Sequence, residues 1–329
     1  MLRSETHWLW DSWIADDGDA YHLFYLQAPR SLGDAGRRHL NATVGHAVST
    51  DLVSWEVLPE ALGPTPGSWD DLSIWTGSTV LGDDGVWRTF YAATSTRGYG
   101  VRDQRVGLAE SDDLVTWRKV GTSPLLVADP RWYQTLPEDV TASETWRDPQ
   151  VFRDPDGDGW HMLVTARSLT HGPHDDGVLA HARSHDLRHW ELGPPVCDAG
   201  FGFGQLEVAQ VKQVEGRWVL VFTCHPQEMT AERRAATGDY CTWSVPGTSA
   251  TGPWDVGLAR PFTAEPDLFA APLVQRRDGT WALVGFLNTE PKGALNFHIT
   301  DPIPVGLDEH GTLRADNVIR SGRPGDPFV

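Results

Sequence analysis

Short runs of alternating apolar and polar residues, joined in pairs by turns rich in Asp and Gly, recur along the whole chain. Alternate side chains of a strand face opposite sides of a sheet, so each pair of runs is typical of a β-hairpin. No long segment has the apolar period of an amphipathic helix. The pattern predicts an all-β protein with almost no helix. The clearest hairpins cover residues 13–25, 78–91, 150–164, 210–222 and 273–284.

A second motif, Ser-x-Asp-Leu-x-x-Trp, divides the chain into repeats. It covers residues 49–55, 111–117 and 184–190, with a weaker copy ending at Trp254 and a decayed fifth at 300–302. Successive Trp residues lie 62 (117−55), 73 (190−117) and 64 (254−190) positions apart. We expect the Asp to cap a turn and the Trp to pack between repeats.

Each repeat is long enough for a four-stranded antiparallel sheet, and five such sheets arranged radially form a β-propeller. We therefore predict a single five-bladed β-propeller over residues 1–329. In this fold the innermost strand of every blade lines a central channel. Polar residues just before each hairpin should meet there, although they are far apart in the sequence.

Composition narrows the function. The 45 acidic and 27 basic residues give a net charge of −18, which argues against nucleic acids and anionic membranes as partners. No apolar run approaches the roughly 20 residues of a membrane-spanning helix, and the first residues lack the apolar region of a signal peptide. We therefore expect a cytoplasmic protein. The three cysteines form neither a disulfide framework nor a metal-binding pair, and we expect no cofactor.

The 16 tryptophans are an unusual number. An indole ring must be buried while its N–H finds a partner, so this excess needs a reason. One reason is the repeated Trp of the motif, and the other is stacking on sugar rings. Three Trp residues fall in loops near the predicted channel mouth and are candidates for stacking: Trp69, Trp75 and Trp132.

Acidic residues stand at the head of four of the five predicted innermost strands: Asp11, Asp148, Glu207 and Asp267. The second strand has Trp75 and Thr76 there instead. Glycoside cleavage needs two carboxyl groups at the scissile bond, one ionised and one protonated. A third can hold sugar hydroxyls and stabilise positive charge at the anomeric carbon. We predict Asp11, Asp148 and Glu207 as the site carboxylates, with Asp267 contacting substrate.

The ordered set of motifs resembles the clan that holds glycoside hydrolase families 32 and 68, the β-fructofuranosidases, levanases and levansucrases. Residues 45–62, with Gly45-His46-Ala47 and the first Asp-Leu-x-x-Trp, are similar to the end of the first blade in family 32. The other similar segments are Tyr21–Tyr25 with Pro29, Thr76-Gly77-Ser78, Arg147-Asp148-Pro149, Glu207, and Trp10-Asp11-Ser12-Trp13, which is closer to family 68.

This resemblance implies that Asp11 is the nucleophile, Asp148 the stabiliser of the transition state and Glu207 the general acid/base. Arg147 would orient Asp148 or contact the sugar. Further substrate contacts are implied for Trp10, Gln27, Trp75 and Thr76. Family 32 also carries a C-terminal β-sandwich, which we do not expect here because the chain ends about where the propeller closes.

Several positions depart from the family 32 pattern. Trp10 and Ser12 flank the first Asp, where that family has Asn and Pro. Val44 and Val208 stand where it has Trp and Cys, and its Gln after Phe-Tyr is displaced to Gln27. The identity of the furanoside therefore stays open.

The favoured hypothesis is a retaining β-fructosidase or fructosyltransferase that acts on short oligosaccharides. An inverting arabinofuranosidase or xylosidase of the related family 43 is one alternative, and a non-catalytic sugar-binding propeller is another. We predict no metal site, although the turn at Asp154–Gly159 resembles half of a calcium loop. The oligomeric state, including a homo-oligomer, stays open.

Overall fold

The computed structural model describes residues 1–96, 103–136, 144–288, 297–309 and 311–316, and these fold almost entirely into strands. The one α-helix of this part is α1 (Ala231–Thr237). Short 3-10 segments are η1 (Arg30–Leu32), η2 (Ala35–Asn41), η4 (Pro226–Glu228) and η5 (Val256–Leu258). Within the described ranges no helix is long or apolar enough to cross a bilayer. The all-β prediction is confirmed.

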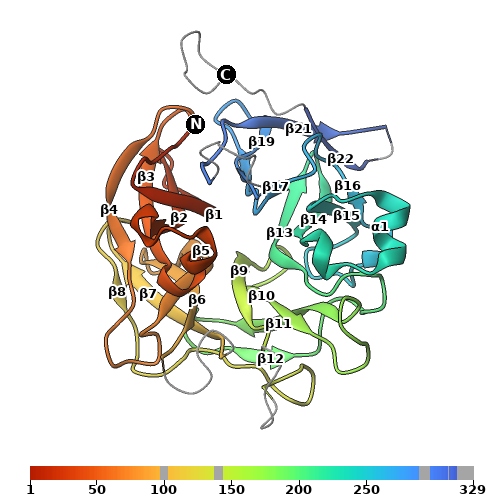
Figure 1. Cartoon of the computed structure of the whole chain (residues 1–329), viewed down its shortest axis with the longest axis horizontal. Coiled ribbons are helices and arrows are strands. Elements are labelled where there is room, and N and C mark those ends of the chain that lie inside the picture. Colours follow the sequence, from red (N-terminus) through yellow and green to blue (C-terminus); the bar gives the residue numbers. More distant parts are fainter. Residues whose placement is uncertain (97–102, 137–143, 289–296, 310, 317–329) are drawn as a thin grey trace.

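Five four-stranded antiparallel sheets follow one another around a central axis, as the repeats predicted (Figure 1). The first blade contains β1 (His7–Asp16), β2 (Tyr21–Pro29), β3 (Thr43–Ser49) and β4 (Glu56–Leu62). The second contains β5 (Ser73–Leu81), β6 (Trp87–Thr94), β7 (Arg105–Ser111) and β8 (Arg118–Lys119). The third contains β9 (Arg147–Arg153), β10 (Trp160–Arg167), β11 (Gly177–Ser184) and β12 (Glu191–Gly193).

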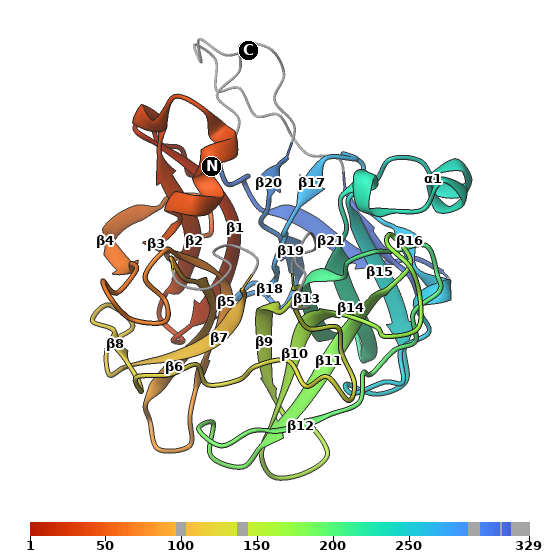
Figure 2. The same cartoon turned by 60° about the horizontal axis from the view of Figure 1, so that its bottom comes forward.

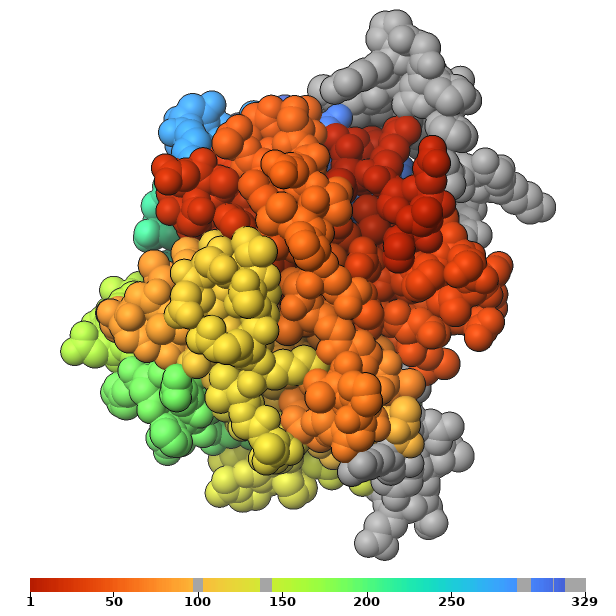
Figure 3. Space-filling model, turned by 90° about the vertical axis from the view of Figure 1, so that its left-hand side faces the viewer, coloured from red at the N-terminus to blue at the C-terminus, as the bar shows by residue number. Residues whose placement is uncertain are grey.

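The fourth blade contains β13 (Glu207–Val214), β14 (Arg217–Thr223), β15 (Thr242–Gly247) and β16 (Arg260–Pro261). The fifth contains β18 (Leu273–Gln275), β19 (Trp281–Leu283), β21 (Ile303–Leu307) and β22 (Leu313–Ala315), with the short pair β17 (Leu268–Phe269) and β20 (Phe286–Leu287) beside it. The innermost strands β1, β5, β9, β13 and β18 surround the axis (Figure 2). Seen from the side, the first two blades present adjoining outer surfaces (Figure 3).

The two ends of the ring meet through backbone hydrogen bonds. Leu2 and Ile299 exchange two N–H···O bonds of 3.0 Å, and the Leu9 N–H donates to the Phe297 carbonyl at 3.0 Å. The Arg277 guanidinium of the last blade also pairs with the Asp16 carboxylate of the first, with Nη2 and Oδ1 2.8 Å apart. The first and last blades are therefore held together as neighbouring blades.

The repeated motif has the structural role that the sequence predicted. In its first copy, the Asp51 carboxylate accepts the N–H groups of Val53 and Ser54 at 2.8 and 2.7 Å. The Leu of each copy has a positive φ of 62–64°. Trp117 of the second blade packs edge-on against Phe24 of the first, and Trp190 of the third packs in the same way against Phe90 of the second, each pair at 5.6 Å.

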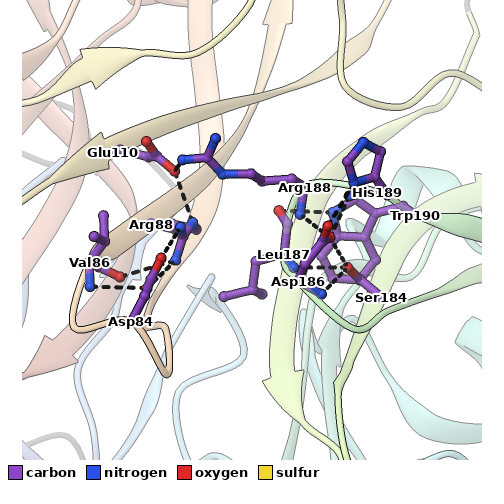
Figure 4. Close-up of polar contacts among 10 residues, drawn as sticks. All are labelled: Asp84, Val86, Arg88, Glu110, Ser184, Asp186, Leu187, Arg188, His189 and Trp190. Carbon is purple, nitrogen blue, oxygen red and sulfur yellow. Dashed lines mark hydrogen bonds and ion pairs between the residues drawn. The ribbon is translucent and has the colours of Figure 1, made fainter.

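An ion network joins the second and third blades beside this motif (Figure 4). The Glu110 carboxylate accepts from the buried Arg88 at 3.0 Å and from Arg188 of the next blade at 2.6 Å. Asp84 also holds Arg88, with Oδ2 2.7 Å from Nη2. A buried guanidinium needs such partners because an uncompensated charge away from water is costly.

Nearer the axis, side chains of the innermost strands bond to the backbone of the next blade. Ser78 of β5 accepts the Val151 N–H at 2.9 Å and donates to the Pro149 carbonyl at 2.8 Å. Gln150 of β9 accepts the Val211 N–H at 3.1 Å. Gln210 of β13 donates to Ala271 at 2.7 Å and accepts the Leu273 N–H at 2.8 Å. These bonds connect blades two to five in series, and we call them the axial bonds.

Two histidine pairs occupy equivalent places in the first and third blades, and all four rings are buried except that of His181, which is half-buried. His22 Nδ1 and His46 Nε2 are 3.0 Å apart, and the rings are stacked. His161 and His181 repeat the arrangement at 2.9 Å. Burial, with a smaller effect of His22, lowers the pKa of His46 to about 3. His46 is therefore neutral in the folded protein at neutral pH.

We predict that Gln210→Met lowers the free energy of unfolding by about 2–5 kcal/mol, because it leaves a buried N–H and a buried carbonyl of the fifth blade without partners. Chemical denaturation measures the change. Gln213→Met is the matched control, since Gln213 lies exposed on the same strand. Equal effects of the two substitutions would contradict the role of the axial bonds.

We also predict that acid weakens the fold through His46. The pKa of this group is lower in the folded chain than in the unfolded one, so the unfolded state binds the proton first as the pH falls below about 6.5. Stability is lost on that side, by about 2 kcal/mol between pH 7 and pH 5 for one such histidine. His46→Gln should flatten the dependence by this amount, and an unchanged slope would refute the assignment.

Candidate active site

A pocket of about 260 Å³ opens at one end of the channel, and the three predicted carboxylates line it together. Asp11 comes from β1, Asp148 from β9 and Glu207 from the start of β13. Trp10, Trp75, Thr76 and Arg147, which the sequence also singled out, line the same pocket. Residues nearly 200 positions apart in the sequence therefore share one small volume.

A break in the strand register lies at or next to each of the three carboxylates. On the innermost strands β1, β5, β9 and β13, one extra residue is inserted opposite the second strand of the blade. The breaks fall at Asp11, at Trp75–Thr76, at Asp148–Pro149 and at Val208–Ala209. Such bulges bend a strand and redirect its side chains. Asp148 and Val208 adopt positive φ values of 57° and 48° there, a conformation that non-glycine residues rarely take.

Asp11 accepts a hydrogen bond of 3.1 Å from the Thr76 hydroxyl of the next blade. Burial raises the pKa of Asp11 to about 7, and the negative charges of Asp148 and Glu207 add to this effect. The Thr76 bond and the positive charge of Arg38 act in the opposite direction. Near neutral pH this carboxyl group therefore exists in both protonation states.

Asp148 is the most enclosed of the three. Its Oδ2 accepts the Thr165 hydroxyl and the Val208 N–H, each at 3.2 Å, and lies 3.6 Å from Arg147 Nε. Burial raises the pKa of Asp148 to about 6, while Arg147 opposes the rise. Three partners fix the direction of this carboxylate, so it is well placed to face one point of the pocket.

Arg147 connects the site residues. Its Nη2 pairs with the Glu207 carboxylate, and its Nη1 donates to Gln104 Oε1 at 3.3 Å. Burial lowers the pKa of Arg147, but the charges of Glu207 and Asp148 outweigh burial and raise it overall. The guanidinium therefore stays charged and compensates two carboxylates of the cluster.

Aromatic residues form the pocket walls together with the segment η2. The Trp75 indole N–H donates to the His39 carbonyl at 2.9 Å, and the Arg38 guanidinium lies 5.6 Å from the Trp10 ring centroid. Sequence reasoning missed several lining residues. Two of them, Arg38 and His39, belong to η2, which lies between the hairpin and the repeat motif and matches neither pattern. The missed residues are Leu26, Arg38, His39, Gln104, Gln205, Phe269, Phe286 and Asn288.

In the described part of the chain, the Trp10 indole Nε1 and Gln205 Oε1 of the pocket wall are buried without a hydrogen-bond partner. A buried polar atom without a partner is costly, and a ligand hydroxyl can supply that partner. One atom is a donor and the other an acceptor. Both suit sugar hydroxyls.

Two predicted substrate contacts do not lie at the pocket. Gln27 donates to Thr43 at 3.4 Å and to Glu60 at 3.3 Å, so its side chain reaches toward the outer strands of its own blade. Asp267 precedes β17, and its carbonyl accepts the N–H of the pocket residue Asn288 at 2.9 Å. Asp267 does not line the pocket, and Phe269, two residues later, contributes to the pocket wall instead.

Trp69 and Trp132 also lie outside the pocket lining. Trp69 stacks on Tyr91 with ring centroids 6.1 Å apart, which is a packing role. Of the three loop tryptophans proposed for sugar stacking, only Trp75 reaches the site.

Comparison of the sequence with known protein families identifies relatives of this chain. The model of the glycosyl hydrolases family 32 N-terminal domain matches residues 4–290. The bifunctional 6(G)-fructosyltransferase/2,1-fructan:2,1-fructan 1-fructosyltransferase of Allium cepa is 31% identical over 204 residues, which are 59% of this chain and 29% of that protein. The invertase of Schizosaccharomyces pombe is 28% identical over 64% of this chain and 35% of its own length. The chain thus spans about a third of the length of these relatives.

Solved structures share the fold. The inulosucrase from Halalkalicoccus jeotgali bound to kestose has a TM-score of 0.78 at 20% identity, over 98% of this chain and 92% of that one. The Bombyx mori GH32 beta-fructofuranosidase BmSUC1 has a TM-score of 0.73 at 19% identity, over 97% and 64%. At these identities the structures support the propeller fold, and the family assignment rests on the sequence match. Because that match covers most of the chain and includes all three pocket carboxylates, the protein belongs to the family 32 glycosyl hydrolases.

Proposed function

We propose that the protein is a retaining glycoside hydrolase or fructosyltransferase that acts on β-fructofuranosides. The observation that carries the proposal is the meeting of Asp11, Asp148 and Glu207 in one pocket, around Arg147. A pair of carboxyl groups is the minimum for glycoside cleavage. The third carboxylate and the charged guanidinium suit a reaction in which positive charge develops at the anomeric carbon.

In the proposed reaction, the ionised Asp11 carboxylate attacks the anomeric carbon while Glu207 gives a proton to the departing oxygen. The C–O bond to the leaving group breaks as the bond to Asp11 forms. Glu207 then takes a proton from water or from another sugar hydroxyl, whose oxygen displaces Asp11. The anomeric configuration is retained because the carbon is inverted twice. Asp148, fixed by Thr165 and Val208, stabilises the positive charge that develops at the anomeric carbon in the transition state of each step.

The pocket supports a small oligosaccharide as substrate. Its volume of about 260 Å³ suits a single sugar ring, so the rest of the substrate would extend out of the mouth. Structural neighbours include proteins bound to kestose and to fructosylnystose. A purely sugar-binding propeller is disfavoured, because Glu207 faces the pocket and is held by Arg147.

We predict that the three carboxylates respond differently to substitution. Asp11→Asn should abolish turnover on every substrate, because no leaving group replaces the attacking oxygen. Glu207→Gln should lose about 10²–10⁴-fold on a natural fructoside and far less on one with an activated leaving group. Azide should accelerate Glu207→Gln by releasing the sugar from Asp11. Asp148→Asn should lose activity on both substrates without rescue.

Steady-state kinetics on sucrose and on an aryl fructoside would measure these effects. NMR of the first-formed product would give its anomeric configuration. Inversion would overturn the retaining mechanism in favour of the family 43 type. Equal losses of Glu207→Gln on both substrates, with no effect of azide, would remove Glu207 from the acid/base role. Turnover of aryl arabinosides alone would overturn the fructoside assignment.

We predict that Arg38→Gln shifts the acid limb of kcat/KM to higher pH. The positive charge of Arg38 lowers the pKa of Asp11, so removing it raises this pKa and a higher pH is needed to ionise the nucleophile. The profile of kcat/KM reports the free enzyme and is the measurement to use. Arg37→Gln is the control, because Arg37 is an exposed neighbour on η2 and lies outside the pocket. A shift to lower pH, or equal shifts in both variants, would contradict the prediction.

A further inference from the structure

A second cavity of about 440 Å³ lies on the channel axis behind the catalytic pocket. We call it the rear chamber. Innermost strands of all five blades line it, and three residues line both cavities: Thr76, Asp148 and Val208. The lining continues along each strand away from the carboxylates, for example from Ser12 to Asp16 on β1. The rear chamber is thus separated from the site only by a shared wall.

Equivalent positions of four innermost strands line the rear chamber with half-buried side chains. Each lies two residues after the inner residues Ser12, Ser78, Gln150 and Gln210. In the first three blades the side chain is apolar, and in the fourth it is a lysine: Ile14, Val80, Phe152 and Lys212. A lysine at a position that the sister repeats fill with apolar residues introduces a charge into an otherwise apolar ring.

Lys212 is not neutralised within the described part of the chain. Burial alone lowers its pKa, and no carboxylate acts on it. The acidic residues of the lining have other partners. Asp16 pairs with Arg277, and Asp148 is held by Arg147, Thr165 and Val208. In a protein of net charge −18, the rear chamber therefore keeps an uncompensated cation.

We propose that the rear chamber binds a small organic monoanion with an apolar body, whose carboxylate contacts the Lys212 ammonium. An anion would compensate the unpaired charge of this half-buried lysine, and one cation suits one negative charge. The walls provide apolar and aromatic surface through Phe152, Val80 and Trp281. The volume lies within the range of about 300–1,000 Å³ that is usual for small-molecule sites.

The side chains that line the rear chamber favour a different kind of ligand from the sugar proposed for the catalytic pocket. A sugar needs many hydrogen-bond partners, whereas most polar groups around the rear chamber are engaged; among the described residues, the buried Ser12 hydroxyl is an exception. The Trp13 N–H donates to Thr79, and Gln150 and Gln210 form axial bonds. Apolar contact and one ion pair remain as the main interactions that the rear chamber can offer.

Binding of 3-phenylpropionate to the whole protein, measured by calorimetry, tests the proposal, with neutral 3-phenylpropanamide as the matched probe. We expect Lys212→Met to weaken binding of the carboxylate about 10–100-fold, as for loss of a charged hydrogen bond. The amide should bind the unaltered protein about as weakly as the carboxylate binds Lys212→Met. Lys212→Arg should retain binding, which guards against a folding defect in the first variant.

Two control variants locate the bound probe. Arg314→Met removes an exposed cation on β22, away from the rear chamber, and should leave binding unchanged. Arg38→Gln alters the catalytic pocket and should also leave it unchanged. Absence of binding to the unaltered protein, equal affinity for Lys212→Met, or a loss caused by Arg38→Gln would each overturn the proposal. The readout needs no turnover, so it is independent of the proposed fructosidase activity.

Discussion

The axial bonds set the spacing of the innermost strands, and the rest of the structure depends on that spacing. Ser78, Gln150 and Gln210 each satisfy backbone groups of the following blade, close to the channel. Buried backbone groups must be paired, so a blade cannot move relative to its neighbour without losing these bonds. The Trp of the repeat and the network at Glu110 provide the corresponding contacts farther from the axis.

This fixed frame allows the strained geometry of the site. The register breaks lie next to the axial bonds, within two residues of Ser78, Gln150 and Gln210. Positive φ values at Asp148 and Val208 persist because the surrounding sheet holds them. Asp148 also receives bonds from two different blades, through Thr165 and Val208. The direction of the carboxylate therefore depends on how the third and fourth blades are placed relative to each other.

Concentrating acidic groups in a small, poorly hydrated volume has an electrostatic cost, which appears as the raised pKa values of Asp11 and Asp148. The positive charge of Arg147, within the cluster, lowers the pKa of Asp148, and that of Arg38, at the pocket mouth, lowers the pKa of Asp11. Arg38 also serves the proposed reaction, because the nucleophile must be ionised and the positive charge of Arg38 favours that form of Asp11. Electrostatic compensation and catalysis thus depend on the same side chains.

The sequence by itself determined the features that repeat. Hairpin alternation, the Ser-x-Asp-Leu-x-x-Trp motif and acidic residues at the heads of the strands were enough to predict five blades and the convergence of Asp11, Asp148 and Glu207. These features are local in the sequence. Because the blades are related by the symmetry of the propeller, each feature occupies the equivalent place in successive blades. The prediction was wrong or incomplete where that symmetry fails.

Gln27 lies on a second strand and turns toward Thr43 and Glu60, and Asp267 belongs to the blade whose innermost strand is shortest. Arg38 and His39 reach the pocket from η2, in the connection between the second and third strands of the first blade, and this connection differs from blade to blade. The direction of a side chain at a strand end, and the path of a loop across the mouth, depend on contacts between blades. No local pattern encodes those contacts, so only the tertiary structure decided which residues complete the pocket.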